Sequence, residues 1–516
     1  MNTKEMVKMA EFSPIEALPK DENNLRRLSN ARPDNYQNPQ PAAVYNMVVI
    51  GGGSAGLVTA IVAAGLGAKV ALIEKYLMGG DCLNVGCVPS KAIIRSAKTM
   101  GEIMAAQEFG IISGGAQVNF GEVMTRIRRV QAQLSPNDSV WRYRDAGVDV
   151  FLGEGRFTGP DTIEMAGATL KFKKAVITTG SRPLHPEIPG LVEAGYLTNE
   201  TVFNLTEQPK RLAIVGGGPI GCELAQAFRR LGSEVTLFHN ADHILNREDA
   251  DAAEIVQKVF LREGIKLALN SQVTQITTQG DEKIVRFTMA KEEGTITVDE
   301  ILVATGRVPN IENLGLETVG VQSDARKGIS VNDYLQTTNP NIYAAGDVAM
   351  AYKFTHAANA AARIVIQNAF FHGRKKLSDL KMPWCTYTDP EIAHVGLYDY
   401  DAKEKGIKID TYTIYFDDND RAVADGEENG FVKVHTLKGK DTIVGATIVA
   451  RAAGDMINEI TLAMVAGVGL KTIGNVIHPY PTQAEAIARV AGLYTRSRLT
   501  PTVKWLFSGW MKFNRR

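Results

Sequence analysis

The chain has 516 residues, too many for one simple hydrophobic core, so we expect several domains that share one active site. Its 57 Lys and Arg residues balance its 57 Asp and Glu residues, which gives no basis for a nucleic-acid partner. Four cysteines are far too few for a secreted scaffold held by disulfides. The first residues mix charged and apolar side chains and do not predict a signal peptide, so we expect a cytoplasmic protein.

Residues 1–44 are polar and rich in Pro and Asn, which predicts an arm on the surface or a disordered segment. The stretch Met47–Ile73 that follows is nearly uncharged and long enough to pass a test for a membrane span. It contains six glycines, however, and divides into strand, glycine-rich turn, helix and strand. We therefore interpret it as a buried βαβ unit.

This first unit carries a G-x-G-x-x-G turn between its strand and its helix. Gly51 permits the tight turn, Gly53 lets the backbone approach a pyrophosphate, and Gly56 lets the helix pack on the strand. The helix N-terminus supplies N–H donors for the phosphates. Glu74 ends the second strand, where a carboxylate can bind ribose hydroxyls. The unit therefore predicts a dinucleotide site.

The segment GGDCLNVGCVPSK places Cys82 and Cys87 five residues apart. In an ideal helix that separation rises about 7.5 Å along the axis. A disulfide needs Cα atoms roughly 4.4–6.8 Å apart. The backbone between the two cysteines must therefore be distorted, and Asn84 and Gly86 are residue types that tolerate distortion.

Metal binding is the main alternative for this cysteine pair. Zinc sites prefer ligands roughly two to four residues apart and need further ligands. The chain has no second cysteine pair, so we expect no metal site.

From about residue 45 to residue 495 the sequence resembles the class I pyridine nucleotide–disulfide oxidoreductases, and GGDCLNVGCVPSK is the most specific shared motif. The resemblance implies FAD at the first glycine loop and a redox-active disulfide beside it. Cys87 would be the charge-transfer thiol and Cys82 the interchange thiol that meets the substrate. Lys91 would lie near the flavin N5 and pair with Glu223. A helix N-terminus and a nearby lysine both lower a thiol pKa, which suits a thiolate at the flavin.

Further segments resemble family motifs in the expected order. In GEGRF, Gly155 would give backbone contacts to the adenine, and in NIYAAGDVA, Asp347 would bind the ribityl chain. ITTGSRP and VATGRVPN, the second of which contains Gly306, resemble the linking segments near each nucleotide.

The second strand–glycine–helix unit predicts the nicotinamide nucleotide site, with Gly216, Gly218 and Gly221 in its loop. His239 stands at the strand end where an acidic residue would favour NADH. A neutral or basic residue there admits a 2′-phosphate, and Arg247 could pair with that phosphate. We therefore predict NADPH, with NADH as the alternative.

The chain departs most clearly from the family pattern at the acid–base residue. The disulfide reductases carry His-Pro-Thr-x-x-Glu, and in IHPYPTQAEA the position of that histidine holds Tyr480, with Glu485 as the acid. In a homodimer this pair would come from the second subunit. Tyrosine titrates at about pH 10 and imidazole at about 6.5, so Tyr480 is a poor base. His478 is the alternative base, although we favour a structural role for it.

With tyrosine at this position, the chain resembles the mercuric-reductase-like branch of the family. The 516 residues hold neither the adjacent C-terminal cysteines nor the N-terminal metal-binding domain of that branch. Tyr480 alone therefore does not establish Hg(II) as the substrate.

The last segment, Leu493–Arg516, mixes aromatic and basic residues. A helix from Thr502 would gather the aromatic side chains on one side. Such helices lie on membranes. They also dock on a protein's own dimer surface, which we favour over membrane contact.

We expect an α/β protein with two Rossmann-like dinucleotide-binding domains and a C-terminal α+β dimerisation domain. The expected segments are an arm at 1–44, an FAD domain at 45–185 and 310–378, an NAD(P)H domain at 186–309, an interface domain at 379–492 and a tail at 493–516.

Electrons would pass from NAD(P)H through FAD to the disulfide of Cys82 and Cys87 and on to an unidentified small-molecule or metal-ion acceptor. The alternatives are a mercuric or other metal-ion reductase, and a diaphorase docked on a membrane or complex that serves a protein or quinone.

Overall fold

The computed structural model of the chain describes residues 17–112, 114–165 and 167–515. The chain forms two compact units. The first comprises the residues up to Asp242 and Glu263–Leu380, and the second comprises His243–Arg262 and the residues from Lys381 onward. Within the described ranges no helix has both the length and the apolar character needed to cross a membrane.

A mainly parallel sheet forms the centre of the first half of unit one, in the order β3–β2–β1–β6–β5–β4, with β18 beside β6. The long strand β6 pairs antiparallel with β5 in its first half and parallel with β1 and β18 in its second. The parallel strands end at one edge, and the nucleotide-binding segments follow them there. The strands are β1 (Tyr45–Ile50), β2 (Val70–Glu74), β3 (Val148–Leu152), β4 (Gly155–Gly159), β5 (Thr162–Met165), β6 (Ala168–Ile177) and β18 (Ile342–Ala344).

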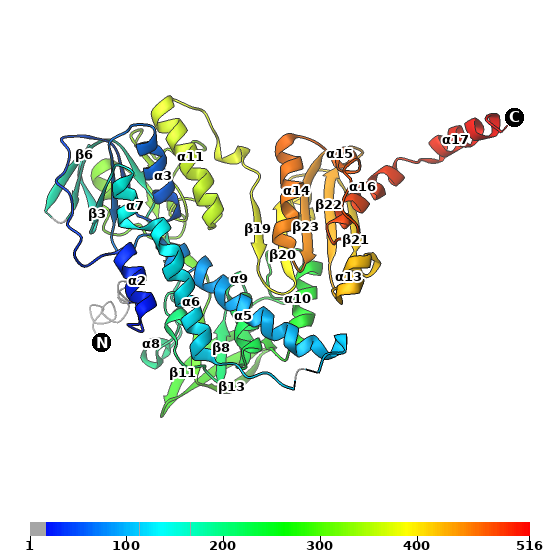
Figure 1. Cartoon of the computed structure of the whole chain (residues 1–516), viewed down its shortest axis with the longest axis horizontal. Coiled ribbons are helices and arrows are strands. Elements are labelled where there is room, and N and C mark those ends of the chain that lie inside the picture. The colour runs from blue at the N-terminus through cyan, green and yellow to red at the C-terminus, as the bar shows by residue number, and fades with distance from the viewer. Residues whose placement is uncertain (1–16, 113, 166, 516) are drawn as a thin grey trace. The chain divides into compact units, whose positions relative to one another are not determined.

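Helices α3 and α11 lie side by side against this sheet (Figure 1). The predicted βαβ unit is confirmed, because β1 and β2 are parallel neighbours joined by α3. The helices of this half are α2 (Glu22–Ala31), α3 (Ser54–Gly65), α4 (Gly80–Asn84), α5 (Cys87–Ala105), α6 (Phe120–Leu134), α7 (Val140–Asp145) and α11 (Thr355–Phe371), with short 3₁₀ turns η1 (Ala106–Phe109), η2 (Ser135–Asp138) and η5 (Leu377–Asp379).

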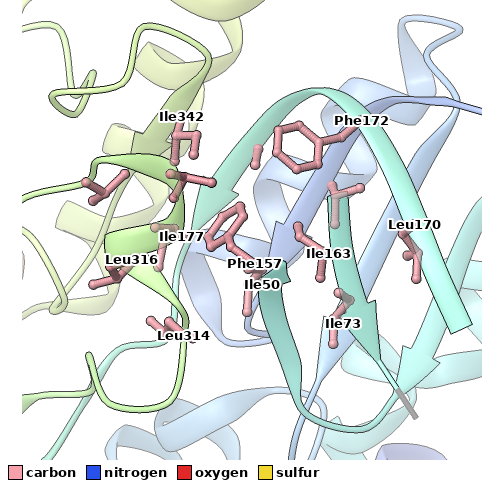
Figure 2. Packing of buried hydrophobic residues seen from close by; sticks show 14 of the residues in the cluster. Ile50, Ile73, Phe157, Ile163, Leu170, Phe172, Ile177, Leu314, Leu316 and Ile342 are labelled. Carbon is pink, nitrogen blue, oxygen red and sulfur yellow. The ribbon is translucent and has the colours of Figure 1, made fainter. Parts of the chain in front are cut away.

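The core of this half lies between the parallel strands and the β4–β5–β6 layer (Figure 2). Phe157 and Phe172 pack edge to face with ring centroids 5.9 Å apart. Ile50 and Ile73, at the ends of β1 and β2, are both buried in this cluster. The core therefore holds the two strand ends that carry the first glycine loop and Glu74.

The second half of unit one has a four-stranded parallel sheet in the order β10–β9–β8–β14, with a separate antiparallel β11–β12–β13 sheet. The pair β7–β15 joins the two halves. The elements are β7 (Ser181–Pro183), α8 (Leu191–Ala194), η3 (Val202–Asn204), β8 (Arg211–Val215), α9 (Pro219–Arg230), β9 (Glu234–Phe238), β10 (Lys266–Ala268), β11 (Ser271–Gln279), β12 (Glu282–Met289), β13 (Glu292–Val298), β14 (Glu300–Val303) and β15 (Arg307–Pro309). The chain then returns to the core of the first half with η4 (Leu316–Val319) and the paired strands β16 (Ser323–Asp324) and β17 (Gly328–Ile329).

Unit two is a five-stranded antiparallel sheet in the order β19–β20–β23–β22–β21, covered by helices, which confirms the expected C-terminal α+β domain. Helix α10, although it falls within the range expected for the NAD(P)H domain, is grouped with this unit by its contacts: Asp249 before it and Asp251 within it bind Lys433 of β22. The elements are α10 (Ala250–Arg262), β19 (Pro383–Thr386), β20 (Glu391–Gly396), α12 (Asp399–Glu404), β21 (Ile409–Tyr415), η6 (Phe416–Asp418), α13 (Asp420–Asp425), β22 (Phe431–Leu437), β23 (Ile443–Ala450), α14 (Ala453–Ala466), α15 (Leu470–Ile473), α16 (Glu485–Ser497) and α17 (Pro501–Phe513).

The N-terminal arm is ordered where it is described. Helix α2 begins at a capping aspartate, Asp21, whose side chain accepts a hydrogen bond from the Asn24 amide at 2.8 Å. Arg27 is buried and donates to the carbonyl of Asn84 at 3.2 Å. The helix therefore braces the segment that carries the cysteine pair. Residues 1–16 of the predicted arm lie outside the described residues.

Candidate active site

The first glycine loop leaves room for a phosphate at one position and none at two others. Gly51 has φ +109°, and a Cβ on it would lie 2.3 Å from the carbonyl oxygen of Thr178. A Cβ on Gly56 would lie 1.8 Å from the Gly51 oxygen. A Cβ on Gly53 would meet only the Gly80 Cα, at 3.7 Å. Gly51 and Gly56 therefore close the turn, and Gly53 keeps an open cradle at the start of α3.

Glu74 holds this loop in place from the end of β2. Its buried carboxylate accepts hydrogen bonds from the amides of Gly52 and Tyr76, each at 2.6 Å. Burial raises its pKa, and the two amide hydrogen bonds oppose that shift. The carboxylate thus stands beside the loop at the strand end, the position from which a ribose is bound.

The second glycine loop repeats this geometry. Gly216 has φ +118°, and a Cβ there would lie 2.4 Å from the Ala304 oxygen. A Cβ on Gly221 would lie 1.9 Å from the Gly216 oxygen, whereas one on Gly218 would meet nothing within 4 Å. In the described structure no side chain caps the start of α3 or of α9. Both helix N-termini therefore fit the phosphates of a dinucleotide.

His239 takes the place in the second loop that Glu74 takes in the first. The amide of Gly217 donates to its Nδ1 at 3.2 Å. The strand end of the second unit therefore presents an imidazole where that of the first presents a carboxylate. Arg247 is exposed and lies in unit two, where its carbonyl accepts from the Tyr400 hydroxyl at 2.9 Å.

The helix break predicted between the cysteines is confirmed. Helix α4 ends at Asn84 and α5 begins at Cys87, with Gly86 at φ −128° and ψ −116° between them. A Cβ on Gly86 would lie 2.8 Å from the Asp81 oxygen. Asn84 contributes in another way than expected, because it stays helical and its buried amide donates to Gly80 O at 2.9 Å. Both cysteines are free thiols in this structure, as in the reduced form.

The two thiols have opposite electrostatic environments. The hydrogen bond from Cys82 lowers the pKa of Cys87, and Thr355 and Lys91 lower it further against the effect of burial. The same hydrogen bond, together with burial, raises the pKa of Cys82. Thr355 Oγ1 lies 3.5 Å from the Cys87 sulfur, and Lys91 Nζ lies 2.8 Å from Glu223 Oε2. The pair therefore holds its negative charge on Cys87, at the N-terminus of α5.

A charged network beside the cysteines was not predicted. Arg307 pairs with Asp81, the residue before Cys82, and donates to Ser181 Oγ at 2.7 Å. Ser181 in turn donates to Asp347 Oδ2 at 2.7 Å, and Arg307 lies 3.8 Å from that carboxylate. The signal in the sequence is the arginine of VATGRVPN, which directly follows Gly306. The network ties the predicted ribityl-binding aspartate to the helix of the cysteine pair.

Two further predicted cofactor residues have clear backbone roles. Gly155 is the buried first residue of β4, and a Cβ on it would meet Ile73 Cδ1 at 2.9 Å. Gly306 has φ +127°, a left-handed conformation that favours glycine, directly before β15.

The predicted acid–base residues lie in unit two. The Tyr480 hydroxyl donates to Asp420 Oδ2 at 2.7 Å rather than to Glu485, and this hydrogen bond raises the tyrosine pKa. Glu485 is the first residue of α16. His478 Nε2 lies 3.1 Å from both carboxylate oxygens of Glu459. Sequence reasoning missed Asp420 and Glu459, because both are distant in the chain and bear no motif.

The two other cysteines lie in packed surroundings, away from the cysteine pair in the sequence. Cys222 is fully buried in α9 and donates to Gly217 O at 3.3 Å, and Cys385 packs at the edge of the core of unit two. Across the described ranges no group of three or more His, Cys, Asp or Glu side chains is placed to hold a metal ion.

This fold and site define a class: an oxidoreductase with two dinucleotide cradles and a dithiol beside the first. The profile of the pyridine nucleotide-disulphide oxidoreductases matches residues 45–362, and that of their dimerisation domain matches residues 382–491. The chain belongs to the pyridine nucleotide-disulphide oxidoreductase family. Members of the family use FAD and NAD(P)H.

The chain is similar to several characterised members. Mercuric reductase of Lysinibacillus sphaericus is 34% identical over 87% of this chain and 82% of its own length. Dihydrolipoyl dehydrogenase of Mycoplasma pneumoniae is 35% identical over 86% of this chain and 97% of its own length.

Solved structures are similar over comparable lengths. The Cu(II) complex of the HOCl-induced flavoprotein disulfide reductase RclA of Escherichia coli has a TM-score of 0.77 at 28% identity, covering 88% of this chain and all of that one. LpdA of Mycobacterium tuberculosis has a TM-score of 0.80 at 27% identity, covering 87% of this chain and 99% of that one.

Proposed function

We propose that the chain uses NADPH to reduce a disulfide between Cys82 and Cys87 and passes the electrons to a small acceptor other than a large dithiol or disulfide. The observation that carries this proposal is Tyr480, whose hydroxyl is bound to Asp420 at the position of the family's acid–base histidine. A tyrosine with a raised pKa keeps its proton at neutral pH and takes none from a dithiol.

FAD would bind at the first glycine loop, with Glu74 at its ribose, Gly155 at its adenine and Asp347 at its ribityl chain. When bound, FAD supplies the step between hydride transfer from the nicotinamide and electron transfer to sulfur. Lys91, held by Glu223, would face the flavin N5 and stabilise negative charge there. The open position at Gly53 supports the binding of FAD at the first glycine loop.

The two sulfurs would divide the work. One hydride equivalent, which is two electrons and one proton, reduces the disulfide to one thiol and one thiolate, and the thiol proton is released when the disulfide re-forms. Cys87 carries the thiolate because its pKa is lowered, and Cys82 carries the thiol that meets the acceptor. Oxidation by the acceptor removes two electrons and re-forms the sulfur–sulfur bond.

A thiophilic metal ion is the second candidate for the acceptor. Thiolates are soft ligands that bind soft metal ions, and a reduced dithiol can both bind and reduce such an ion. Hg(II) would take both electrons from one NADPH, whereas Cu(II) would take one, so two Cu(II) ions would be reduced for each NADPH. The similarity to mercuric reductases supports this candidate.

Anaerobic oxidation of the NADPH-reduced holoenzyme tests the acceptor. Stopped-flow reoxidation should be fast with Hg(II) or Cu(II) and at least tenfold slower with lipoamide or glutathione disulfide, about 1.4 kcal/mol in barrier. Tyr480→His should speed the disulfide reactions, and Tyr480→Phe should leave them slow. Rapid wild-type turnover of a disulfide would contradict the proposal. Fast reoxidation by quinones alone would instead support a diaphorase.

The NADPH preference rests on the imidazole of His239 at a position where a carboxylate would repel the 2′-phosphate, with Arg247 as a predicted partner of that phosphate. His239→Glu should lower kcat/KM for NADPH by about tenfold relative to NADH, about 1.4 kcal/mol, because a carboxylate repels that phosphate. His239→Gln is the matched control, since it stays neutral and can still accept from Gly217. An unchanged ratio in His239→Glu, or a wild type that prefers NADH, would refute the preference. Steady-state kinetics with both nucleotides measures it.

The chain should act as a homodimer in the cytoplasm. Unit two matches the dimerisation domain, and exposed apolar side chains gather near His478, with Leu462 68% and Ile477 94% exposed. The proposed domains keep the boundaries expected from the sequence, with His478, Tyr480 and Glu485 supplied by the second subunit.

A further inference from the structure

The C-terminal helix α17 buries none of its apolar side chains against the described part of the chain. It begins at Pro501, capped by Thr500, whose hydroxyl accepts from the Val503 amide at 3.4 Å. None of its described residues is buried. In Figure 1 it stands clear of the other helices and strands of its unit, beyond α16. A capped helix whose apolar side chains stay exposed is stabilised when another surface covers them.

Most apolar residues of α17 lie opposite its lysines, and Trp505 and Met511 form the two borders of the apolar face, beside Lys512 and Lys504. Lys504, Ser508 and Lys512 are spaced by four residues and form one polar line along the helix. At 100° per residue, Trp510 lies opposite this line, and its neighbours on that face are the apolar residues Val503, Leu506, Phe507 and Phe513. Trp510 is 60% exposed and Phe513 is 69% exposed.

The charge of this region selects the kind of surface. From Val490 to the end the sequence has six Lys and Arg residues and no Asp or Glu. The surface of a second subunit, which the sequence pattern favoured, would need only the apolar face. An anionic bilayer also uses cations beside that face and a tryptophan at the headgroup level, and Lys512 next to Trp505 supplies both. Thirteen residues of helix extend about 20 Å, too short to cross a hydrocarbon core of about 30 Å.

We propose that α17 is an interfacial anchor that lies on an anionic lipid surface, with Trp510 and its neighbours in the acyl boundary and the lysines at the phosphates. This anchor is independent of the acceptor. It would place the catalytic domains beside a membrane whether the electrons go to a metal ion or to another small molecule.

Vesicle co-sedimentation of the full-length holoenzyme tests the anchor, with vesicles of phosphatidylcholine alone or mixed with phosphatidylglycerol. Binding should be at least about tenfold stronger with phosphatidylglycerol and should weaken as NaCl is raised. L506Q/W510Q should lose about tenfold or more, because it removes apolar contact without changing charge. S508Q changes the polar line of the same helix and should bind as the wild type does. Turnover of NADPH in solution should be unchanged in both variants.

Three results would overturn the proposal. The wild type could remain in the supernatant at every phosphatidylglycerol content, or L506Q/W510Q could bind as tightly as S508Q. Alternatively, analytical ultracentrifugation without lipid could show that L506Q/W510Q halves the mass of the assembly, which would place α17 on a second copy of the chain.

Discussion

Cys87→Ser should abolish electron delivery to the acceptor, with kcat lowered by about three orders of magnitude or more, about 4 kcal/mol of barrier. FAD should stay bound, because the first glycine loop and Glu74 are untouched. Cys82→Ser should lose acceptor reduction to a similar extent, since either change removes the disulfide. The two variants should nevertheless differ in the spectrum of the oxidised flavin.

The difference follows from where the thiol pair holds its charge. Cys87 is the first residue of α5, Lys91 stands one turn further on, and Thr355 lies 3.5 Å from its sulfur. The hydrogen bond from Cys82, with help from these groups, lowers the pKa of Cys87 from 9.0 to about 6. A serine at position 82 can still donate a hydrogen bond. Cys82→Ser should therefore show a long-wavelength thiolate-to-flavin absorbance that Cys87→Ser lacks.

The pH dependence has a fixed sign. A thiol with a lowered pKa is a thiolate above that pKa and is protonated below it. The absorbance of Cys82→Ser should therefore be full at neutral pH and disappear as the pH falls through about 6. Cys385→Ser, in unit two, is the matched control and should retain turnover. An absorbance in Cys87→Ser but not in Cys82→Ser would reverse the two assignments.

Local sequence pattern was sufficient for the dinucleotide units and for the broken helix between the cysteines. Glycine positions and strand–helix periodicity depend on residues within about twenty positions of one another. The ion pair of Lys91 and Glu223 joins residues 132 positions apart, and only the family resemblance pointed to it.

Contacts between distant segments without a motif were not predictable. Arm helix α2 was expected to be a surface or disordered segment, yet Arg27 binds the backbone of Asn84 across 57 positions. Tyr480 binds Asp420 across 60 positions, where the motif suggested Glu485. Composition alone does not encode such partners, because polar residues become specific only when the fold brings them together.

Because the two glycine loops have the same geometry, single Gly→Ala substitutions can test each cofactor site separately. Gly53→Ala should lower FAD affinity by about two orders of magnitude, about 2.7 kcal/mol, since the cradle fills while the backbone at φ −85° accepts alanine. Gly56→Ala should instead lower the unfolding free energy of the deflavinated protein by at least about 2 kcal/mol, because its Cβ would lie 1.8 Å from the Gly51 oxygen. FAD titration of the deflavinated protein and its urea unfolding distinguish the two effects.

The second loop supplies the matched pair. Gly218→Ala should leave FAD content and stability unchanged and raise the KM for NADPH, because its Cβ would meet only the space left for the nucleotide. Gly221→Ala should destabilise the nicotinamide half, since its Cβ would lie 1.9 Å from the Gly216 oxygen. Loss of FAD from Gly218→Ala, or normal FAD affinity in Gly53→Ala, would mean that the cradles are wrongly assigned. In each loop, therefore, a methyl group at the open glycine should weaken binding of one cofactor, and a methyl group at the closed glycine should destabilise the fold. The two loops share this geometry and differ in the residue at the strand end, which is Glu74 in the first and His239 in the second.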